Sequence, residues 1–288
     1  MLKIYRYGDK ISSPCTLLLG GFDGLHFGHG TLLSHASELK HPVCITTLAG
    51  AKGGALFTQS EREQVFERAG IDCVYEISFT KEVQNTSAEE FLSKLFDDIF
   101  VQAAICGEDF RFGKDAAGTA QLLRLKAPCP VHVMPLAESG GEKIAASRLK
   151  AHLREGELAA LNALLLVPYF IEGTVEHGRA VGRTYGFPTI NLSISAEKLL
   201  PKEGVYIGYA ETPKGSFPAI INFGARPTFE VAEKKIEAYL EGFSGDLYGE
   251  TVRIYPTRYL RAIEKFPSAE ALKEQLEKDK MSLKPAIK

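Results

Sequence analysis

The sequence lacks the features that mark several classes of protein. Lys and Arg number 34 against 36 Asp and Glu, so the net charge of −2 gives no global positive field for nucleic acid. No run of roughly eighteen uncharged apolar residues occurs, as a membrane-spanning helix would require. The opening MLKIYRYGDK has no apolar signal region. We therefore expect a cytoplasmic protein whose partners are neither nucleic acid nor membrane.

Cysteine is sparse and shows no metal-binding or disulfide pattern. The chain has five cysteines, and none of them lies in a CxxC pair or beside a pair of histidines. This spacing argues against a zinc site and against a disulfide framework. Four of the five lie in short apolar runs typical of strands, so we expect buried free thiols in a reducing compartment. The five are Cys15, Cys44, Cys73, Cys106 and Cys129.

Internal repeats and a low-complexity linker are also absent, although 288 residues are enough for two domains. The hydrophobic fraction of 45% is ordinary for a globular protein. Between Asn162 and Pro168 the pattern changes from helical periodicity to β-branched and aromatic residues. This change predicts one domain over residues 1–163 and a second over residues 164–288.

The first half alternates short apolar runs with amphipathic segments. The runs are apolar nearly throughout, as expected for strands covered on both faces. They are CTLLLG, VCITTL, CVYEIS, VQAAIC and VHVM. Between them, Ser87 and Glu90 have the spacing of a capping box at a helix start, and Gly70 is typical of a helix end. The repeated βαβ pattern predicts a doubly wound parallel sheet.

The loop after the first of these strands, GGFDGLHFGHGTLL, carries candidate anion-binding groups. Gly20 and Gly21 permit a tight turn and a close backbone approach, and the following helix start offers free amides to a phosphate. His26 and His29 are three residues apart, so both can face one site and donate hydrogen bonds to phosphate oxygens. By spacing alone, such a histidine pair is more often a surface or capping feature.

The motif HFGH inside this loop resembles the HxGH signature of the nucleotidyltransferase superfamily. The longer GGFDGLHFGHGTLL and a second block, CGEDFRFGKDAAGT, are similar to the FMN adenylyltransferase half of bacterial FAD synthetases. The resemblance implies that His26 and His29 assist attack of a phosphate on the α-phosphate of ATP. It also implies an ATP- and flavin-binding set in this domain: Gly20, Gly21, Phe22, Asp23, Gly107, Asp109, Ser147 and Arg148.

Two segments depart from that family's pattern. A TFEPHP-like segment is expected after the second strand, and TTLAGAKGGALF stands there without its histidine or prolines. The family's SSTxIR segment is replaced by AASRLK, so two hydroxyl-bearing positions are Ala145 and Ala146, and Lys150 replaces the arginine. Alanine side chains cannot hydrogen-bond, and lysine lacks the forked donor geometry of arginine. We expect adenylyl transfer at a reduced rate; the alternative is its loss.

The second half opens with the glycine-rich stretch GTVEHGRAVGRTYGFPTIN. Its glycines at Gly173, Gly178 and Gly182 let backbone amides approach a phosphate. Thr189 and Asn191 lie two apart, so on a strand both offer neutral oxygens on one side to a hard cation such as magnesium. Spacing alone favours a simpler reading, a β-hairpin region with glycine turns and a strand that starts at Pro188.

Short strands follow to the end of this half, broken by Gly, Pro and Asp, and they predict a closed antiparallel barrel with a terminal helix capped by Ser268. The glycine-rich stretch resembles the nucleotide-binding signature of riboflavin kinases. Further similar blocks are GVYIGYA, INFGARPTF, IEAYLEGFSGDLYG and LRAIEKF. The resemblance implies a six-stranded barrel, magnesium at Thr189 and Asn191, and Glu237 as general base. The implied ATP- and flavin-binding residues are Gly173, His177, Gly178, Gly182, Arg183, Pro188 and Arg261.

Each of these roles has an alternative in the residues themselves. Without the resemblance, Glu237 is an ordinary solvated strand residue, and His177 and Arg183 are solvated loop residues. Arg261 can instead pair with a carboxylate.

The two resemblances together cover nearly the whole chain and imply a bifunctional riboflavin kinase/FAD synthetase. Such an enzyme converts riboflavin and ATP to FMN and then FMN and ATP to FAD, with magnesium carried by ATP. The alternative is a kinase alone, with a first domain that binds flavin nucleotide as a regulatory module. A barrel that binds single-stranded nucleic acid is disfavoured because Lys and Arg do not cluster with aromatic residues. The sequence leaves self-association open.

Overall fold

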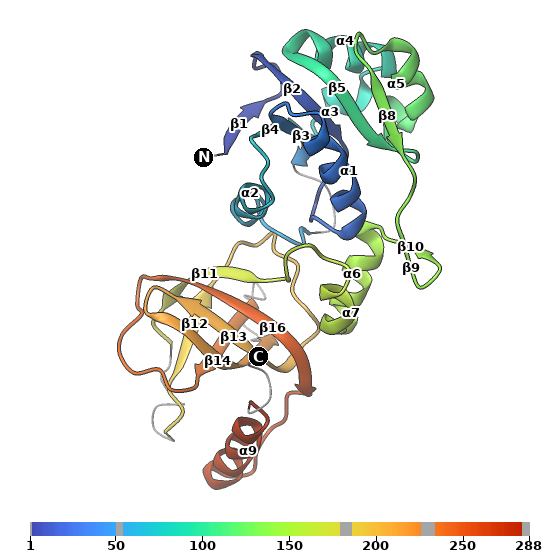
Figure 1. The fold of residues 1–288 in the computed structure, drawn as a ribbon. Coiled ribbons are helices and arrows are strands. Elements are labelled where there is room, and N and C mark those ends of the chain that lie inside the picture. The colour runs from blue at the N-terminus through green and yellow to red at the C-terminus, as the bar shows by residue number, and fades with distance from the viewer. Residues whose placement is uncertain (1, 50–53, 179–185, 226–233, 284–288) are drawn as a thin grey trace. The chain divides into compact units, whose positions relative to one another are not determined.

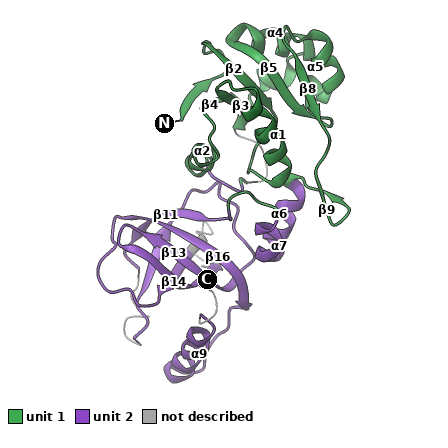
Figure 2. Cartoon of the chain, viewed as in Figure 1, with its two compact units in different colours: residues 1–55, 59–146, 164–167 green, residues 56–58, 147–163, 168–288 purple. Residues whose placement is uncertain are grey.

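The computed structural model describes residues 2–49, 54–178, 186–225 and 234–283 (Figure 1). The chain divides into two compact units, coloured separately in Figure 2. The first unit comprises residues 1–55, 59–146 and 164–167, and the second comprises residues 56–58, 147–163 and 168–288. Residues 147–163 thus group with the second unit, whereas the sequence analysis placed them in a domain over 1–163. Gly182 and Arg183 lie outside the described residues.

The first unit is built on a six-stranded sheet in the order β1-β4-β3-β2-β5-β8, in which every neighbouring pair is parallel. The five strands predicted from apolar runs are present. One edge strand, β1, was not predicted, because its residues are mostly exposed and do not alternate between buried and exposed positions. The strands are β1 (Lys3–Arg6), β2 (Ile11–Leu19), β3 (Val43–Ala49), β4 (Cys73–Ser78), β5 (Ile99–Gly107) and β8 (Val131–Met134).

Helices connect these strands as the βαβ pattern predicts. The predicted capping box is formed: Ser87 Oγ accepts from Glu90 N, and the Glu90 carboxylate accepts from Ser87 N. The helices are α1 (Phe27–Glu38), α2 (Gln59–Arg68), α3 (Lys81–Asn85), α4 (Ala88–Asp98), α5 (Ala120–Lys126) and the 3-10 turn η1 (Lys114–Ala116). Two short hairpins complete the unit: β6 (Arg111–Phe112) with β7 (Gly118–Thr119), and β9 (Glu138–Ser139) with β10 (Glu142–Lys143).

One covered face of this sheet forms the core of the first unit. The strand residues Leu17, Tyr75 and Ala104 pack there with Leu95 of α4, and all four are fully buried. The phenol of Tyr75 donates to the buried carboxylate of Asp98 at 2.5 Å, and Lys94 Nζ lies 3.1 Å from the same carboxylate. All five cysteines are free thiols, and four of them are buried, as predicted.

The second unit contains a closed antiparallel barrel in the order β11-β12-β15-β14-β13-β16. It has the six strands that the resemblance implies: β11 (Ile171–Glu176), β12 (Thr189–Ser193), β13 (Gly204–Thr212), β14 (Gly215–Ala225), β15 (Lys234–Leu240) and β16 (Thr251–Arg261). Among the residues that the structure describes, it is accompanied by the helices α6 (Ala146–Glu155), α7 (Leu158–Asn162) and α9 (Ala269–Met281). The break between α6 and α7 falls at Gly156, whose φ is +76°.

Strand residues of the barrel alternate between its interior and its outer face. Ile236, Ala238 and Leu240 are buried inside, and Glu237 and Tyr239 point outward. Helix α9 begins as predicted, with Ser268 Oγ accepting from Ala271 N at 3.2 Å. Leu283, just beyond that helix, packs with a cluster of Val205, Ile207 and Ile220. By strand register, these three residues lie on the same outer face of the barrel as Tyr239.

A buried lysine fastens residues 56–58 to the barrel within the second unit. Lys198 is only 2% exposed, and its ammonium donates to Leu56 O at 2.7 Å and to Phe170 O at 2.5 Å. The rings of Phe57 and Tyr169 lie 4.9 and 4.5 Å from the same ammonium.

Among the described residues, no helix combines the length and apolarity needed to cross a membrane.

Candidate active sites

The loop after β2 is shaped by close contact between Gly20 and Phe22. A Cβ at Gly20 would lie 2.8 Å from the Phe22 ring, so glycine is required there. Phe22 has a φ of +41°, a conformation that costs a non-glycine residue free energy and is common at functional sites. The Gly20 amide donates to Thr46 Oγ1 of β3 at 3.2 Å. Gly21 and the half-buried Asp23 lie in the same loop, at the carboxyl end of β2, where doubly wound sheets bind ligands.

The two predicted histidines meet at the start of α1. His26 is the residue before the helix, and its ring stacks on that of His29 with centroids 3.7 Å apart. His29 Nδ1 lies 3.1 Å from Gly24 O and 3.5 Å from His26 N, so it donates to the carbonyl in one tautomer and accepts from the amide in the other. His26 Nδ1 is buried and makes no hydrogen bond. The stacked pair therefore has unused hydrogen-bonding capacity.

Both imidazoles are neutral at physiological pH. Burial lowers the pKa of His26 to about 4, with a further lowering by the charge of Lys143. The pKa of His29 is lowered to about 3, chiefly by burial and secondly by the neighbouring His26. Neutral imidazoles can each donate one hydrogen bond, and an incoming polyphosphate would favour their protonated forms.

The second predicted block supplies a carboxylate close to these histidines. Asp109 follows β5 and forms an ion pair with Lys143 of β10. A Cβ at Gly107 would lie 2.9 Å from the Asp109 carboxylate, so glycine lets this side chain fold back over the strand end. Both charges affect the pKa of His26, so these three groups share one site. Sequence reasoning missed Lys143, because its short hairpin lies outside every motif.

The altered AASRLK segment forms the start of α6. Ser147 and Arg148 lie in the first turn of that helix and belong to the second unit, whereas His26, His29 and Asp109 belong to the first.

A further cation in the first unit was not predicted. Arg62 of α2 is 8% exposed, its Nη1 donates to Leu48 O at 3.4 Å, and its Nε is buried without a hydrogen bond. Leu48 lies near the carboxyl end of β3, so this cation lies at the edge of the sheet where doubly wound folds commonly bind ligands.

In the barrel, strand register brings the candidate base and metal ligands together. Asn191 of β12 lies directly opposite Glu237 of β15 on one side and Glu176 of β11 on the other. Directly opposed residues of antiparallel strands project from the same face, so these three side chains form one row on the outer surface. Thr189 shares this face and lies opposite Tyr239. Sequence reasoning missed Glu176, whose role depends on the pairing of β11 with β12.

The glycines of the stretch from Gly173 to Asn191 make room for this row. A Cβ at Gly178 would lie only 2.1 Å from Asn191 Nδ2, and a Cβ at Gly173 would lie 2.5 Å from Ser193 O. Gly178 is therefore the residue that lets the Asn191 amide occupy its position. The adjacent His177 ring stacks on Tyr248, with centroids 3.7 Å apart. Pro188 directly precedes β12.

The row offers oxygen ligands suited to magnesium. Thr189 and Asn191 supply neutral oxygens, Glu237 and Glu176 supply carboxylates, and the space kept by Gly178 admits the Asn191 amide. Within the described part of the chain, no cluster of three His, Cys, Asp or Glu residues could hold a metal alone. Magnesium usually takes one or two protein ligands and completes its shell with water and substrate phosphates, so the donor set fits it.

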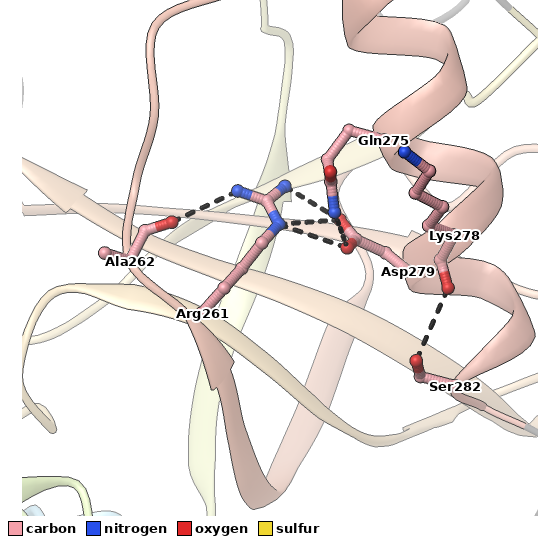
Figure 3. Close-up of polar contacts among 6 residues, drawn as sticks. All are labelled: Arg261, Ala262, Gln275, Lys278, Asp279 and Ser282. Atoms are coloured by element: carbon pink, nitrogen blue, oxygen red, sulfur yellow. Dashed lines mark hydrogen bonds and ion pairs between the residues drawn. The ribbon is translucent and has the colours of Figure 1, made fainter.

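Arg261, a predicted flavin or ATP contact, is engaged elsewhere in this structure. Its guanidinium binds the carboxylate of Asp279 in α9, with Nη2 2.7 Å from Oδ2, and its Nη1 donates to Ala262 O (Figure 3). A role in ligand binding stays a prediction for Arg261.

Comparison with known proteins assigns a family to each half of the chain. The family model for FAD synthetase matches residues 9–148, and the family model for riboflavin kinase matches residues 165–287. These matches define a two-domain enzyme of flavin-nucleotide synthesis, with a nucleotidyltransferase sheet and a flavokinase barrel. The chain belongs to the family of bifunctional riboflavin kinase/FMN adenylyltransferases.

Individual relatives cover nearly the full length. The bifunctional riboflavin kinase/FMN adenylyltransferase of Bacillus subtilis is 32% identical over 285 residues, which cover 92% of this chain and 90% of the relative. The Escherichia coli enzyme of the same name is 29% identical, with coverage of 97% and 95%. A Streptococcus pneumoniae crystal structure described as a macrolide-efflux protein has a TM-score of 0.91 at 27% identity and covers 99% of both chains.

Proposed function

We propose that residues 164–288 phosphorylate riboflavin with ATP to give FMN, and that residues 1–163 adenylylate FMN with a second ATP to give FAD and pyrophosphate. The observation that carries the proposal is the row of Asn191, Glu237 and Glu176 on the barrel, together with the stacked His26 and His29 on the sheet. Both family matches agree with this division. We further propose that the enzyme works in the cytoplasm, where its five thiols stay reduced.

In the kinase reaction, the 5′-hydroxyl oxygen of riboflavin attacks the γ-phosphorus of ATP, and ADP leaves. The hydroxyl must lose its proton in this step, and Glu237 is the carboxylate positioned to accept it. Thr189 and Asn191 would hold magnesium beside that carboxylate, with Gly173, His177 and Gly178 close to the phosphates. When bound, magnesium neutralises the charge on the transferring phosphate.

In the adenylyl transfer, a phosphate oxygen of FMN attacks the α-phosphorus of ATP, and pyrophosphate leaves. Negative charge builds on the α-phosphate oxygens, and hydrogen-bond donors placed there stabilise the transition state. The neutral, stacked imidazoles of His26 and His29 at the amino end of α1 are suited to this role. The free amides of that helix end add partial positive charge.

The rival function is that of a kinase whose first unit only binds flavin nucleotide. Ala145 and Ala146 favour it, because each removes a side-chain donor expected near the phosphates. Lost donors of this kind slow a reaction by about ten- to a hundredfold each, which leaves a measurable rate. Arg62 and Lys143 supply cationic groups that the motifs did not foresee. We therefore favour adenylyl transfer that is slowed but present.

A time course of riboflavin with excess magnesium-ATP and pyrophosphatase tests both activities. Chromatography would separate riboflavin, FMN and FAD, and a His29→Ala variant would be run beside the wild type. We expect FMN and then FAD from the wild type, and only FMN from the variant. FMN alone from both chains would establish the rival function, and no conversion by the wild type would contradict the kinase assignment as well.

A further inference from the structure

Asn222 of β14 extends the candidate kinase site by one strand. It lies directly opposite Glu237, so the outer row runs from Glu176 through Asn191 and Glu237 to Asn222 over four adjacent strands. Neighbouring strands are about 4.8 Å apart, which sets the spacing between successive members of the row. Asn222 is therefore a direct neighbour of the proposed base, on the side away from Asn191.

The side-chain oxygen of Asn222 lacks a hydrogen-bond partner. Oδ1 is buried and accepts no hydrogen bond, although its residue is only partly buried. Most buried side-chain polar atoms are paired, and an amide oxygen left without a donor costs about 1 to 3 kcal/mol. What this atom lacks is a donor, and a substrate hydroxyl would be one.

An apolar side chain borders the same position. A Cβ at Gly224, the next residue on this face of β14, would lie 3.3 Å from Ile263 Cδ1 and 3.7 Å from Asn222 Oδ1. Ile263 is 45% exposed, so part of its apolar surface is open to a ligand. The glycine thus keeps the amide of Asn222 and the apolar surface of Ile263 next to each other.

We propose that Asn222 is a specificity-determining residue that binds the ribityl chain of riboflavin. The inference rests on the proposed kinase function and deepens it. With the 5′-hydroxyl at Glu237, the polyol chain crosses one strand spacing to Asn222, and the isoalloxazine ring continues toward Ile263. Oδ1 accepts a hydrogen bond from a secondary hydroxyl of the chain, which holds the terminal hydroxyl in line with the carboxylate.

This arrangement makes the barrel selective for a polyol over an alkyl chain. A site built to hydrogen-bond a hydroxyl rejects an analogue without it, because the protein group is then left buried and unpaired. The matching probe is a flavin with a 5-hydroxypentyl chain, which keeps the reacting hydroxyl and lacks the other three. Its phosphorylation reports the same chemical step without the proposed contact.

The test is a two-by-two comparison of kcat/KM for riboflavin and the hydroxypentyl flavin, in the wild type and in Asn222→Ala. We expect the substitution to lower kcat/KM for riboflavin by about 10- to 100-fold and to change that for the hydroxypentyl flavin by less than about threefold. Asn222→Ser, which keeps a hydrogen-bonding group, should recover part of the loss on riboflavin only. Ser216→Ala, an exposed position on the same strand and face, is the matched control and should change neither.

Two results would overturn the inference. An equal loss on both flavins would show that Asn222 acts on Glu237 or on the fold, and no loss on riboflavin would show that it makes no contact. Thermal unfolding of each variant distinguishes misfolding from lost binding. The ratio of kcat/KM for the two flavins in the wild type is a further test that requires no variant. A wild type that phosphorylated the hydroxypentyl flavin as well as riboflavin would also contradict the contact. A wild type that phosphorylated neither flavin would overturn the kinase assignment itself.

Discussion

Arg261 and Asp279 join the last barrel strand to the terminal helix by three hydrogen bonds. Arg261 Nε lies 3.1 and 3.2 Å from the two carboxylate oxygens, and Nη2 lies 2.7 Å from Oδ2 (Figure 3). Gln275 Nε2 also donates to this carboxylate, at 2.8 Å. Asp279 is 2% exposed, so the pair is shielded from solvent and its partners are fixed. This relationship makes α9 a structural part of the barrel.

Removal of the carboxylate should therefore destabilise the barrel. We expect Asp279→Ala to lower the free energy of unfolding by about 2 to 4 kcal/mol, because it leaves the Arg261 charge partly buried and unpaired. Urea denaturation would measure the loss. Glu277→Ala, at an exposed position of the same helix, is the control and should change stability by less than about 0.5 kcal/mol. Equal effects of the two substitutions would contradict a structural role for the pair.

The role of Glu237 as general base predicts a loss in the chemical step. Glu237→Gln keeps the size of the side chain and removes its basicity, so we expect riboflavin and ATP to bind while phosphorylation slows by about 10²- to 10⁴-fold. Single-turnover kinetics would measure the step. Formation of FAD from added FMN by the same variant provides a control for folding. Turnover near the wild-type rate would remove Glu237 from the mechanism.

Gly178 offers a test of the magnesium site that leaves every proposed ligand in place. Gly178→Ala adds a Cβ at a point 2.1 Å from Asn191 Nδ2, so the amide must move. We expect the magnesium concentration for half-maximal kinase activity to rise at least about tenfold, with weaker binding of ATP. Gly186→Ala also replaces a glycine of the same stretch, but a Cβ there meets no atom within 4 Å. Gly186 has a φ of +81°, so its alanine variant adds backbone strain without a steric contact at Asn191 and should leave the magnesium requirement unchanged. A magnesium titration that matches the wild type would contradict the proposed role of Asn191.

The fold was largely predictable, because its signals are local. In β15, Ile236 and Ala238 are buried inside the barrel and Glu237 between them points outward, as a strand period of two requires. The capping box of Ser87 and Glu90 fixed a helix start within four residues of sequence. Patterns of this kind depend on neighbours along the chain, so a single sequence carries them.

The sites were only partly predictable, because they depend on strand register. Asn222 is a neighbour of Glu237 only through the pairing of β14 with β15, and nothing in the local sequence states which residues face each other. The same holds for Lys143, which reaches Asp109 across the fold, and for Arg261, whose carboxylate partner lies eighteen residues away. Motif resemblance identified residue types, and the structure supplied their neighbours.

Arg62 gives a prediction about adenylyl transfer. Its Nε is buried without a hydrogen bond near the carboxyl end of β3, so the guanidinium is free to take a phosphate oxygen. We expect Arg62→Gln to slow FAD formation by about ten- to a hundredfold and to leave FMN formation unchanged. Arg68→Gln, on the exposed end of the same helix, is the matched control. Equal loss of FAD and FMN formation would indicate a general loss of structure.

The stacked histidines predict a specific dependence of stability on pH. Their pKa values in the folded chain are about 4 for His26 and about 3 for His29, below the ordinary value of 6.5. Between pH 6.5 and these lower values, the unfolded chain therefore binds more protons than the folded chain. Stability from the neutral pair is thus fully present above pH 6.5 and is lost as the pH falls toward 4. Between pH 7 and pH 5 we expect the wild type to lose about 1 to 3 kcal/mol more than a His26→Gln, His29→Gln double variant.

Urea denaturation at both pH values would measure this difference. Asp98, whose carboxylate is hydrogen-bonded by Tyr75 and Lys94, has a pKa below its ordinary value of 3.8, so its contribution is lost only in more acidic solution. The window between pH 7 and pH 5 therefore isolates the histidines. Parallel losses in the wild type and the double variant would contradict a lowering of the two pKa values by burial.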